Sequence, residues 1–399
     1  MAFIINIWKV FIGLFLLFFL QTPTFAILAI DEFDEVEQYD EAVFLEVDKP
    51  NIQKVIIEKN VINEEKRFST PDGTFLDLFK SSGYAIDSGF IKNLKVRYFF
   101  HGGNLFTMQS DKDLANNMSV AANEIHFETT LANDKTTFKT GIEFSSSKKY
   151  DNDFFKRFSF MYIEHIFNEN NSLMLGQMRV PNGIEGRTPS LFIKLLTRSQ
   201  IARTLGNAVS NGIRVTGEYD YFHYDVGYYD ASRFFNYNFE GQELAALFSV
   251  KPLSKFDGKY GNLRLGGSID VGNSKNSFSV VGAHAIYNYK KFYMDFEYQY
   301  ANGYAGAYYG QGRYHGLYTT ASYFVKPNLE LVARYDFFQN LNGNQNVSQE
   351  YTAGVTYYLR PQVKFMLNYI YAMKDTSSIP THKVFLGADF TSSALLDLL

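Results

Sequence analysis

Residues 292–300 read FYMDFEYQY, and apolar and polar side chains alternate along the whole stretch. Phe296 and Tyr298 would share one face of a strand, and Asp295 and Glu297 would share the other. Alternation of this kind predicts a β-strand with one apolar and one polar face. The polar face carries charges, which are costly to bury in a packed core unless they are paired.

The same alternation recurs along the chain in segments of roughly ten residues separated by turns, which is the pattern of transmembrane β-barrels. Further examples are NLKVRYFF (93–100), EIHFETTL (124–131), NLRLGGSIDV (262–271), LELVARYDF (329–337) and VKFMLNYIY (363–371). We count about sixteen such segments between Ile91 and Phe390, and single-chain bacterial barrels require an even number. The sequence therefore predicts an all-β fold, a transmembrane antiparallel β-barrel of about sixteen strands.

A soluble β-sandwich or solenoid would also alternate apolar and polar faces. Two features favour the membrane. Tyrosines gather near the ends of the predicted strands, as at Tyr287, Tyr289, Tyr357 and Tyr369, and resemble the aromatic girdles of membrane barrels. Charges recur on the polar face of strand after strand, which a packed core could not bury unpaired. A barrel of this size is too wide for side chains to fill, so we expect a water-filled lumen.

The N-terminus predicts export from the cytoplasm. Lys9 precedes an apolar run from Val10 to Leu20, and small residues follow at Ala26 and Ala29, as in a cleaved signal peptide. We expect residues 1–26 to be that signal peptide. An N-terminal membrane anchor is the alternative, but the run is shorter than the ~20 residues of a spanning helix.

Residues 27–67 are dominated by Asp and Glu, with no Lys or Arg before Lys49. Like charges at this density resist packing, so we expect a periplasmic extension, with calcium binding as a minor alternative. The barrel domain would then span residues 68–399. The chain has no cysteine and a net charge of −4, which excludes a disulfide framework and gives no global attraction to nucleic acid.

The connections between the predicted strands alternate in length. Short ones lie around Asp134, Asn170, Asp220, Lys290, Pro327 and Pro361, with a somewhat longer one near Pro252. Long polar ones lie around Asn104, Lys149, Arg187, Asn236, Gly306, Gly343 and Ser378. Outer-membrane barrels have short periplasmic turns and long external loops, so we expect the long connections at the cell surface.

The third long connection, Pro181 to Gly206, interrupts the alternation and carries a single carboxylate, Glu185. Its bases are Arg187, Lys194, Arg198 and Arg203. Connections of this length inside a compact β chain are more often functional than structural. We expect this long third loop to fold into the lumen and narrow the pore. An ordinary surface loop is the alternative.

Three segments resemble one known family. GQMRVPNGIE (176–185) is similar to the Gly-Gln-x-basic-x-Pro-x-Gly-x-Glu signature of the phosphate-selective porin O and P family. NGIRVTGEYDYFHYDVGYYDA (211–231) resembles the strand pair that follows the signature there, and YYLRPQVKFMLNYIYA (357–372) is similar in type. The resemblance implies a homotrimeric porin in the outer membrane of a bacterium of the Gram-negative type, surrounded by lipid and passing small anions such as phosphate by passive diffusion.

The resemblance also implies that bases of the wall and of the third loop conduct and select the anions, since arginine forks match phosphate oxygens. Arg179 matches the basic position of the signature. The predicted constriction and anion-binding residues are Arg179, Arg187, Lys194, Arg198, Arg203 and Arg214. The predicted lumen wall carries many carboxylates as well, among them Glu124, Asp270, Glu297 and Asp336. Ion selectivity would depend on which of these two sets lies nearer the narrowest part of the pore.

Enzyme chemistry finds little support in the sequence. The seven histidines are scattered without metal-ligand spacing, no Gly-x-Ser-x-Gly motif occurs, and we predict no cofactor. A hydrolase, as among outer-membrane phospholipases and proteases, would need a marked nucleophile beside the carboxylates. The alternative from another class is a non-conducting barrel that acts as a receptor, adhesin or structural anchor through outer loops at residues 233–240, 301–311 and 340–349.

Overall fold

The computed structural model describes most of the chain beyond residue 90. The described residues are 91–109, 112–144, 155–206, 208–231, 241–256, 258–273, 277–306, 309–342, 346–360, 362–374 and 379–397. The predicted signal peptide, the acidic extension and the first part of the predicted barrel domain lie outside these ranges, so their boundaries stay predictions. The connections predicted around Lys149, Asn236, Gly343 and Ser378 also lie outside them.

Sixteen strands make up almost all of the described chain. They are β1 Ile91–Gln109, β2 Lys112–Leu131, β3 Thr136–Phe144, β4 Phe155–Asn168, β5 Asn171–Arg179, β6 Val209–Glu218, β7 Phe222–Asp230, β8 Gln242–Val250, β9 Asn262–Asn273, β10 Ser277–Tyr289, β11 Phe292–Gly306, β12 Tyr309–Lys326, β13 Leu329–Asn340, β14 Val347–Arg360, β15 Val363–Lys374 and β16 Thr381–Asp397. Four short helices lie between strands, three of them between β5 and β6: α5 Ile184–Arg187, η4 Ser190–Phe192, α6 Gln200–Thr204 and η5 Ser254–Phe256. No helix in the described part of the chain is long and apolar enough to cross a membrane.

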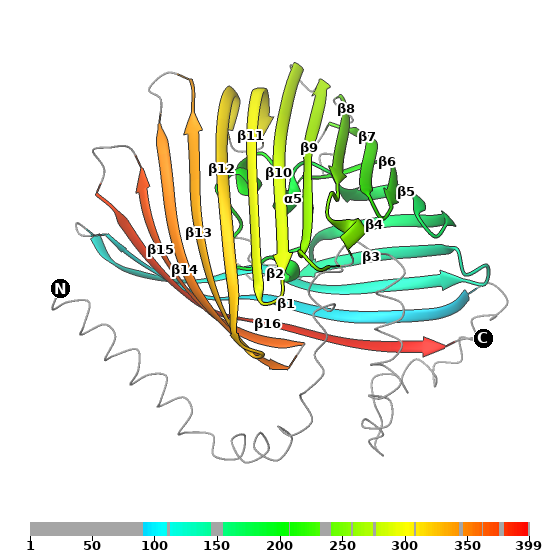
Figure 1. Ribbon diagram of the computed structural model, residues 1–399, viewed down its shortest axis with the longest axis horizontal. Coiled ribbons are helices and arrows are strands. Elements are labelled where there is room, and N and C mark those ends of the chain that lie inside the picture. The colour runs from blue at the N-terminus through cyan, green and yellow to red at the C-terminus, as the bar shows by residue number, and fades with distance from the viewer. Residues whose placement is uncertain are drawn as a thin grey trace, which may run out of the picture. The chain divides into compact units, whose positions relative to one another are not determined.

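Each strand pairs antiparallel with its neighbours in sequence, and β1 pairs with β16 to close the barrel (Figure 1). Closure removes every unpaired sheet edge, so all strand N–H and C=O groups can find partners within the ladder. The predicted fold class, an antiparallel barrel of sixteen strands, is therefore confirmed.

The two faces of the wall follow the alternation in the sequence. Large apolar side chains point outward and stay exposed, such as Ile269 at 44% and Val281 at 43%. Charged side chains point inward, and Asp270, next to Ile269, is fully buried. An apolar outer band and a polar interior are what a barrel in a lipid bilayer requires.

The predicted short turns are confirmed at Asp134 and Lys290. Asp134 lies in the β2–β3 turn and Lys290 in the β10–β11 turn, and both adopt the left-handed backbone conformation, with φ of 59° and 51°. Tight hairpin turns commonly need such a residue because it matches the twist of the flanking strands. The connection near Pro252 is longer and contains η5.

Two of the predicted long connections are wrong. Asn104 lies within β1, paired with Leu386 of β16, and Gly306 is the last residue of β11. Most of the predicted outer loop at 301–311 is likewise strand. The strands are longer than the apolar band, so their outer ends lie where polar residues and glycine are tolerated, and these ends resemble loops in composition.

The last strand also extends further than the alternation suggested. We expected it to end near Phe390, but β16 continues to Asp397. Residues 391–397 pair with residues 93–99 of β1. The extra residues therefore complete the seam that closes the barrel.

Candidate functional site

The segment between β5 and β6, residues 180–208, is the longest non-strand stretch described, residue 207 excepted. We call it the β5–β6 segment. Its apolar side chains are almost completely buried, including Leu195, Leu196, Ile201 and Leu205 at 0–1% exposure. A free surface loop would leave such side chains in water at a cost of about 1.5–3 kcal/mol each. The segment is therefore packed against the rest of the barrel.

Glycines in the wall make room for these apolar side chains. A Cβ atom on Gly316 of β12 would overlap Ile201, and one on Gly387 of β16 would overlap Leu196. Gly354 of β14 faces Leu195 in the same way. Leu196 also packs against Met366 and Phe385. The wall is thus shaped to receive the segment from β12 round to β16.

The start of α5 is fixed by one wall carboxylate. The Ile184 and Glu185 backbone N–H groups donate to Glu297 Oε2 of β11 at 3.1 and 3.4 Å. Gly183 precedes them with a φ of 75°, a conformation that side chains rarely adopt. A Cβ atom on Gly183 would also fall against the Glu297 carboxylate. Glycine is therefore required here on two grounds.

We expect Gly183→Ala to loosen the start of α5 without affecting barrel assembly, because the strand ladder is untouched. An alanine at positive φ costs about 1 kcal/mol or more, and displacing Glu297 adds to this. Single-channel recordings should show a conductance that differs from that of the wild type and fluctuates more. Gly258→Ala, which has a φ of 75° but open space around its Cβ position, is the matched control. If both variants give the same single-channel conductance and the same fluctuation, Gly183 is not required to hold the start of α5 against Glu297.

Glu185 links α5, in which it lies, to the start of α6 and to the barrel wall. Its Oε2 accepts from the Ser199 N–H at 2.6 Å, and its Oε1 accepts from Arg334 Nη1 of β13 at 3.3 Å. Arg334 donates further to the Thr197 carbonyl at 2.9 Å and the Arg198 carbonyl at 3.3 Å. Arg334 is 3% exposed. One buried guanidinium thus holds three residues of the segment against the wall.

The N-terminus of α6 is capped from two sides. Ser199 is the N-cap residue, and its side chain accepts from the Ala202 N–H at 3.3 Å. The Gln200 N–H donates to Asp336 Oδ2 of β13 at 2.8 Å. A carboxylate beside the first turn of a helix is favourable because the free N–H groups there carry partial positive charge. Helix α6 is therefore anchored to β13 at its start.

The segment makes contacts on opposite sides of the barrel. Arg187 Nη1 donates to Asp225 Oδ2 of β7 at 3.2 Å. The Leu196 N–H donates to Asn368 Oδ1 of β15 at 2.8 Å, and His101 Nε2 of β1 lies 3.2 Å from the Leu196 carbonyl oxygen. Strands β7 and β15 are eight places apart in a ring of sixteen. The short stretch from Arg187 to Leu196 thus bridges strands that face each other across the barrel.

The six predicted site residues do not form one cluster. Arg187 and Arg214 both pair with Asp225, whereas Lys194 pairs with Glu330 of β13 and Arg203 with Glu350 of β14. The remaining two lie elsewhere: Arg179 ends β5 and is half-buried, and Arg198 lies inside the segment.

Arg198 has a structural position. Its guanidinium donates to the Glu185 and Thr188 carbonyl oxygens and to Ser190 Oγ. Burial lowers the pKa of Arg198, and the Glu185 carboxylate opposes that shift. Arginine keeps its charge at neutral pH even so. Because its donors are directed at oxygens of the segment, Arg198 stabilises the fold of the segment.

Several inward-facing bases outside the segment were not among the predicted site residues. They are Lys139, Arg157, Lys251, Arg264, Lys364 and Lys383, and each is paired with a wall carboxylate. The alternation of the strands contained the signal that could have identified them, because every base in phase with a buried carboxylate faces inward.

Solved structures of three outer-membrane proteins share this fold. The anion-selective porin from Comamonas acidovorans is 12% identical, with 75% of this chain and 100% of that chain covered and a TM-score of 0.59. The outer membrane channel DcaP of Acinetobacter baumannii is 13% identical, with 76% and 96% covered and a TM-score of 0.53. The trimer form of in-vitro folded OmpT, an outer membrane protein of Vibrio cholerae, is 14% identical, with 75% and 99% covered and a TM-score of 0.52. Comparison with curated proteins returns no match.

Residues 236–389 match the sequence model of the family described as phosphate-selective porin O and P. Over these residues the chain resembles that family, and its barrel has the fold of the three outer-membrane proteins above. Of the three segments that carried the resemblance in the sequence, only 357–372 lies within the matched part of the chain; the other two precede it. The matched part covers β8 to β15 and about half of β16, and it includes β11 and β13, which contact α5 and α6 through Glu297 and Asp336. The partial family match and the fold both point to a channel rather than an enzyme.

Proposed function

We propose that the porin is a passive diffusion channel for small anions, narrowed by the β5–β6 segment lying across its lumen. Contacts of the segment with β7 and with β15, on opposite sides of the ring, support this position. A chain segment that bridges the lumen leaves a passage only along its sides. Charges beside that passage then decide which ions enter.

One observation carries the anion preference. In ten ion pairs among the described inward-facing residues, the base keeps 13–38% of its side chain exposed, whereas the carboxylate keeps 0–9%. Three pairs do not follow this order: Arg97–Glu128 at 25% and 33%, Arg334–Glu185 at 1% and 10%, and Arg334–Asp336 at 1% and 0%. Acids and bases are nearly equal in number, but in most pairs the base is more exposed to the lumen than its carboxylate. In these pairs the carboxylates lie close to the barrel wall, and the cations lie further into the lumen, where they face water.

The order follows from side-chain length. Asp and Glu are short and stay near the sheet, while Lys and Arg extend past them and keep their charged heads in water. A passing ion therefore meets the positive end of each pair first. Fixed charge is screened within about 8 Å at physiological salt, so the nearer charge outweighs the one behind it in a narrow passage.

The family description supports phosphate-type oxyanions as the solute class. Arg203, the most exposed base of the segment at 38% of its side chain, offers a guanidinium fork to such oxygens. We also propose a homotrimer, which the trimer form of the similar OmpT supports.

The test compares neutralising bases with neutralising their partners. The base variant is Lys139→Gln, Arg157→Gln, Arg203→Gln, and the carboxylate variant is Glu164→Gln, Glu143→Gln, Glu350→Gln. The two variants shift the net charge equally in opposite directions. We expect the base variant to lower the anion-to-cation permeability ratio by about fivefold, since one unit charge at 4 Å in water is worth about 1 kcal/mol. The carboxylate variant should raise the ratio by clearly less.

The measurement is the reversal potential of purified protein in a planar bilayer under a salt gradient. Heat-modifiable gel mobility first establishes that each variant is folded. If the two variants change the permeability ratio equally in opposite directions, only the net charge of the lumen matters. The greater exposure of the bases would then have no effect on ion selectivity. A wild-type porin that prefers cations would overturn the anion channel itself.

A further inference from the structure

The wall opposite the apolar contacts of the β5–β6 segment is open to water. The wall contacts of the segment described above lie on β7, on β11 to β16 and on β1. Strand β4 lies eight places from β12 in the ring of sixteen, and β12 is where Gly316 receives Ile201. Three inward-facing side chains on β2 to β4 keep 21–31% of their surface exposed: His126, Lys139 and Arg157. We call the inward face of β2 to β4 the open wall.

Aromatic rings form a continuous row along the open wall. The row begins at Phe99 of β1, whose ring centroid lies 4.2 Å from that of His126 on β2. His126 is followed by Phe160 of β4 at 4.7 Å, and Phe160 by Tyr162 at 5.7 Å. Phe99 is buried, whereas His126 and Phe160 are only partly covered. We call these four side chains the aromatic row, and its middle part faces the lumen.

A glycine on β3 allows the two middle rings to touch. Gly141 is paired with His126 on one side and with Phe160 on the other. A Cβ atom on Gly141 would lie 2.6 Å from the Phe160 ring, 3.0 Å from the His126 ring and 2.4 Å from Ser159 Oγ. Any larger residue at this position would therefore push the rings of β2 and β4 apart.

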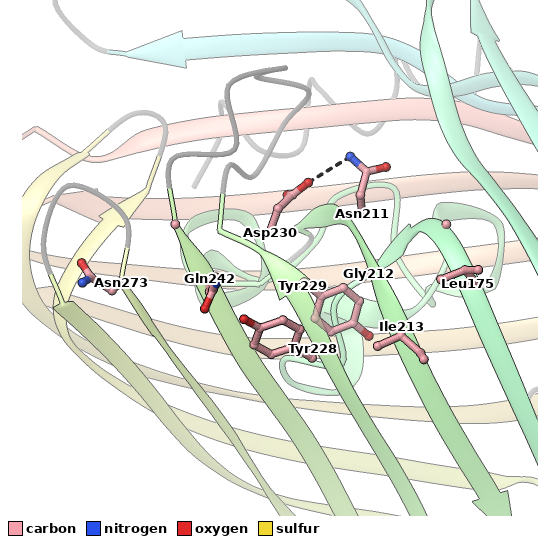
Figure 2. Close-up of a pocket in the computed structure, with 11 residues that line it drawn as sticks. Leu175, Asn211, Gly212, Ile213, Tyr228, Tyr229, Asp230, Gln242 and Asn273 are labelled. Atoms are coloured by element: carbon pink, nitrogen blue, oxygen red, sulfur yellow. Dashed lines mark hydrogen bonds between the residues drawn. The ribbon is translucent and has the colours of Figure 1, made fainter.

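The far end of the aromatic row is fixed in the barrel wall. Tyr162 packs against a buried cluster that includes Met178 of β5 and Tyr229 of β7 (Figure 2). On the lumen side, the segment contributes a further ring, because Phe192 of η4 is 46% exposed and η4 lies beside β1 and β2. The rings that a solute can reach are thus those of His126, Phe160 and Phe192.

Bases lie on both sides of the aromatic row along the barrel axis. Lys139 precedes Gly141 by two residues on β3, and its Nζ is 2.7 Å from Glu164 Oε2. Arg157 precedes Phe160 by three residues on β4 and pairs with Glu143. In both pairs the base is the more exposed partner, at 27% against 9% and at 31% against 5%. A solute on the rings therefore has a cation within reach in either direction.

Two carboxylates near the row have their charge offset. Glu124 is 2.7 Å from His126 Nε2, accepts from Ser159 Oγ at 2.6 Å and keeps 11% of its side chain exposed. Glu128 is more exposed, at 33%, but it pairs with Arg97 and lies beside Lys139 in the strand register. The open wall thus combines exposed rings with exposed cations.

We propose that the open wall binds organic phosphates in which a flat ring lies next to the anionic group. The inference rests on the proposed anion channel and names a solute class within it. The ring of the solute packs on Phe160 and His126, stacked or edge to face, while its phosphate oxygens meet Lys139 or Arg157. A compact phosphate gains only the second contact. Binding through a few such contacts stays weak enough for the solute to leave the lumen.

The experiment compares phenyl phosphate with methyl phosphate as blockers of the chloride current through the purified protein in a planar bilayer. Both carry the same anionic group, and only one carries a ring. We expect phenyl phosphate to halve the current at a concentration about fivefold lower than methyl phosphate, since aromatic contacts contribute beyond the area that they bury.

Two variants on β4 assign the effect to a residue. Phe160→Leu keeps an apolar side chain but removes the ring, and it should bring the two phosphates to within about twofold of each other. The half-blocking concentration of methyl phosphate should stay as in the wild type. Phe158→Leu is the matched control, because Phe158 lies on the outer face of the same strand, and it should keep the preference of the wild type. Heat-modifiable gel mobility establishes that both variants fold.

The outcomes separate this inference from the proposed function. A wild type that is blocked equally by both phosphates and prefers anions refutes the organic-phosphate site and leaves the anion channel intact. A preference that survives in Phe160→Leu, or that is lost equally in Phe158→Leu, overturns the assignment to the aromatic row. A reversal potential that shows preference for cations refutes the anion channel and this inference with it.

Discussion

Replacing Arg334 with methionine is expected to release the β5–β6 segment from the wall while the barrel still assembles. The Arg334 guanidinium donates to Glu185 and to the carbonyls of Thr197 and Arg198, and it is almost fully buried. Removing one partner of a buried ion pair costs about 3–5 kcal/mol, because the other charge is left without compensation. That cost falls on the segment, since the strand ladder keeps all its hydrogen bonds.

Two measurements check this expectation. Limited proteolysis of the purified variant should cut between Pro181 and Gly206, and single-channel recordings should show a larger and less steady conductance. Arg334→Lys should give an intermediate result, since an ammonium cannot reproduce the fork of a guanidinium. Lys139→Met, which removes an inward-facing base paired with Glu164 of β4, should leave the cleavage pattern unchanged. A segment that resists protease in Arg334→Met would show that its remaining contacts hold it without Arg334.

The second large effect is expected on the outer face. Ile269 lies near the middle of β9, is 44% exposed, and is paired with Val281 of β10. An arginine at the bilayer midplane of a β-barrel costs about 2–4 kcal/mol. Ile269→Arg should therefore lower the folded fraction recovered from refolding into lipid vesicles, by about ten-fold or more under marginal conditions.

Ile269→Val is the matched control and should refold as well as the wild type, because it keeps the position apolar. Refolding is read from heat-modifiable gel mobility across a urea series. If Ile269→Arg and Ile269→Val have the same urea midpoint, Ile269 does not face lipid, and the outer face has been assigned wrongly.

The alternation of side chains was sufficient for the architecture. Asp295 and Phe296 are neighbours in sequence, and the pleat of a strand sends them to opposite faces whatever the rest of the chain does. The same alternation recurs in sixteen strands joined by turns at residues such as Asp134 and Lys290. A closed barrel places every apolar face toward lipid and every polar face toward the lumen, and it leaves no strand edge unpaired. The strand count and the polar lumen wall could therefore be predicted from the amino-acid sequence by itself.

The ends of the strands could not be predicted in the same way. Asn104 and Gly306 resemble loop residues, yet both belong to strands, and β16 continues past Phe390. Outside the apolar band neither face is constrained by lipid, so the alternation fades while the ladder continues. Only the register of the neighbouring strand decides where pairing stops.

The partners of the charged residues were decided by the tertiary structure alone. Lys194 and Glu330 are 136 residues apart in sequence and 2.6 Å apart in the fold. Composition showed an excess of bases in the third loop but not that Arg198 is directed at backbone oxygens or that Asp225 holds two arginines. Closure of the barrel sets which side chains meet across the lumen, and side-chain length then sets which charge of each pair faces water. Neither depends on residues that are close in sequence, which is why a local pattern does not contain them.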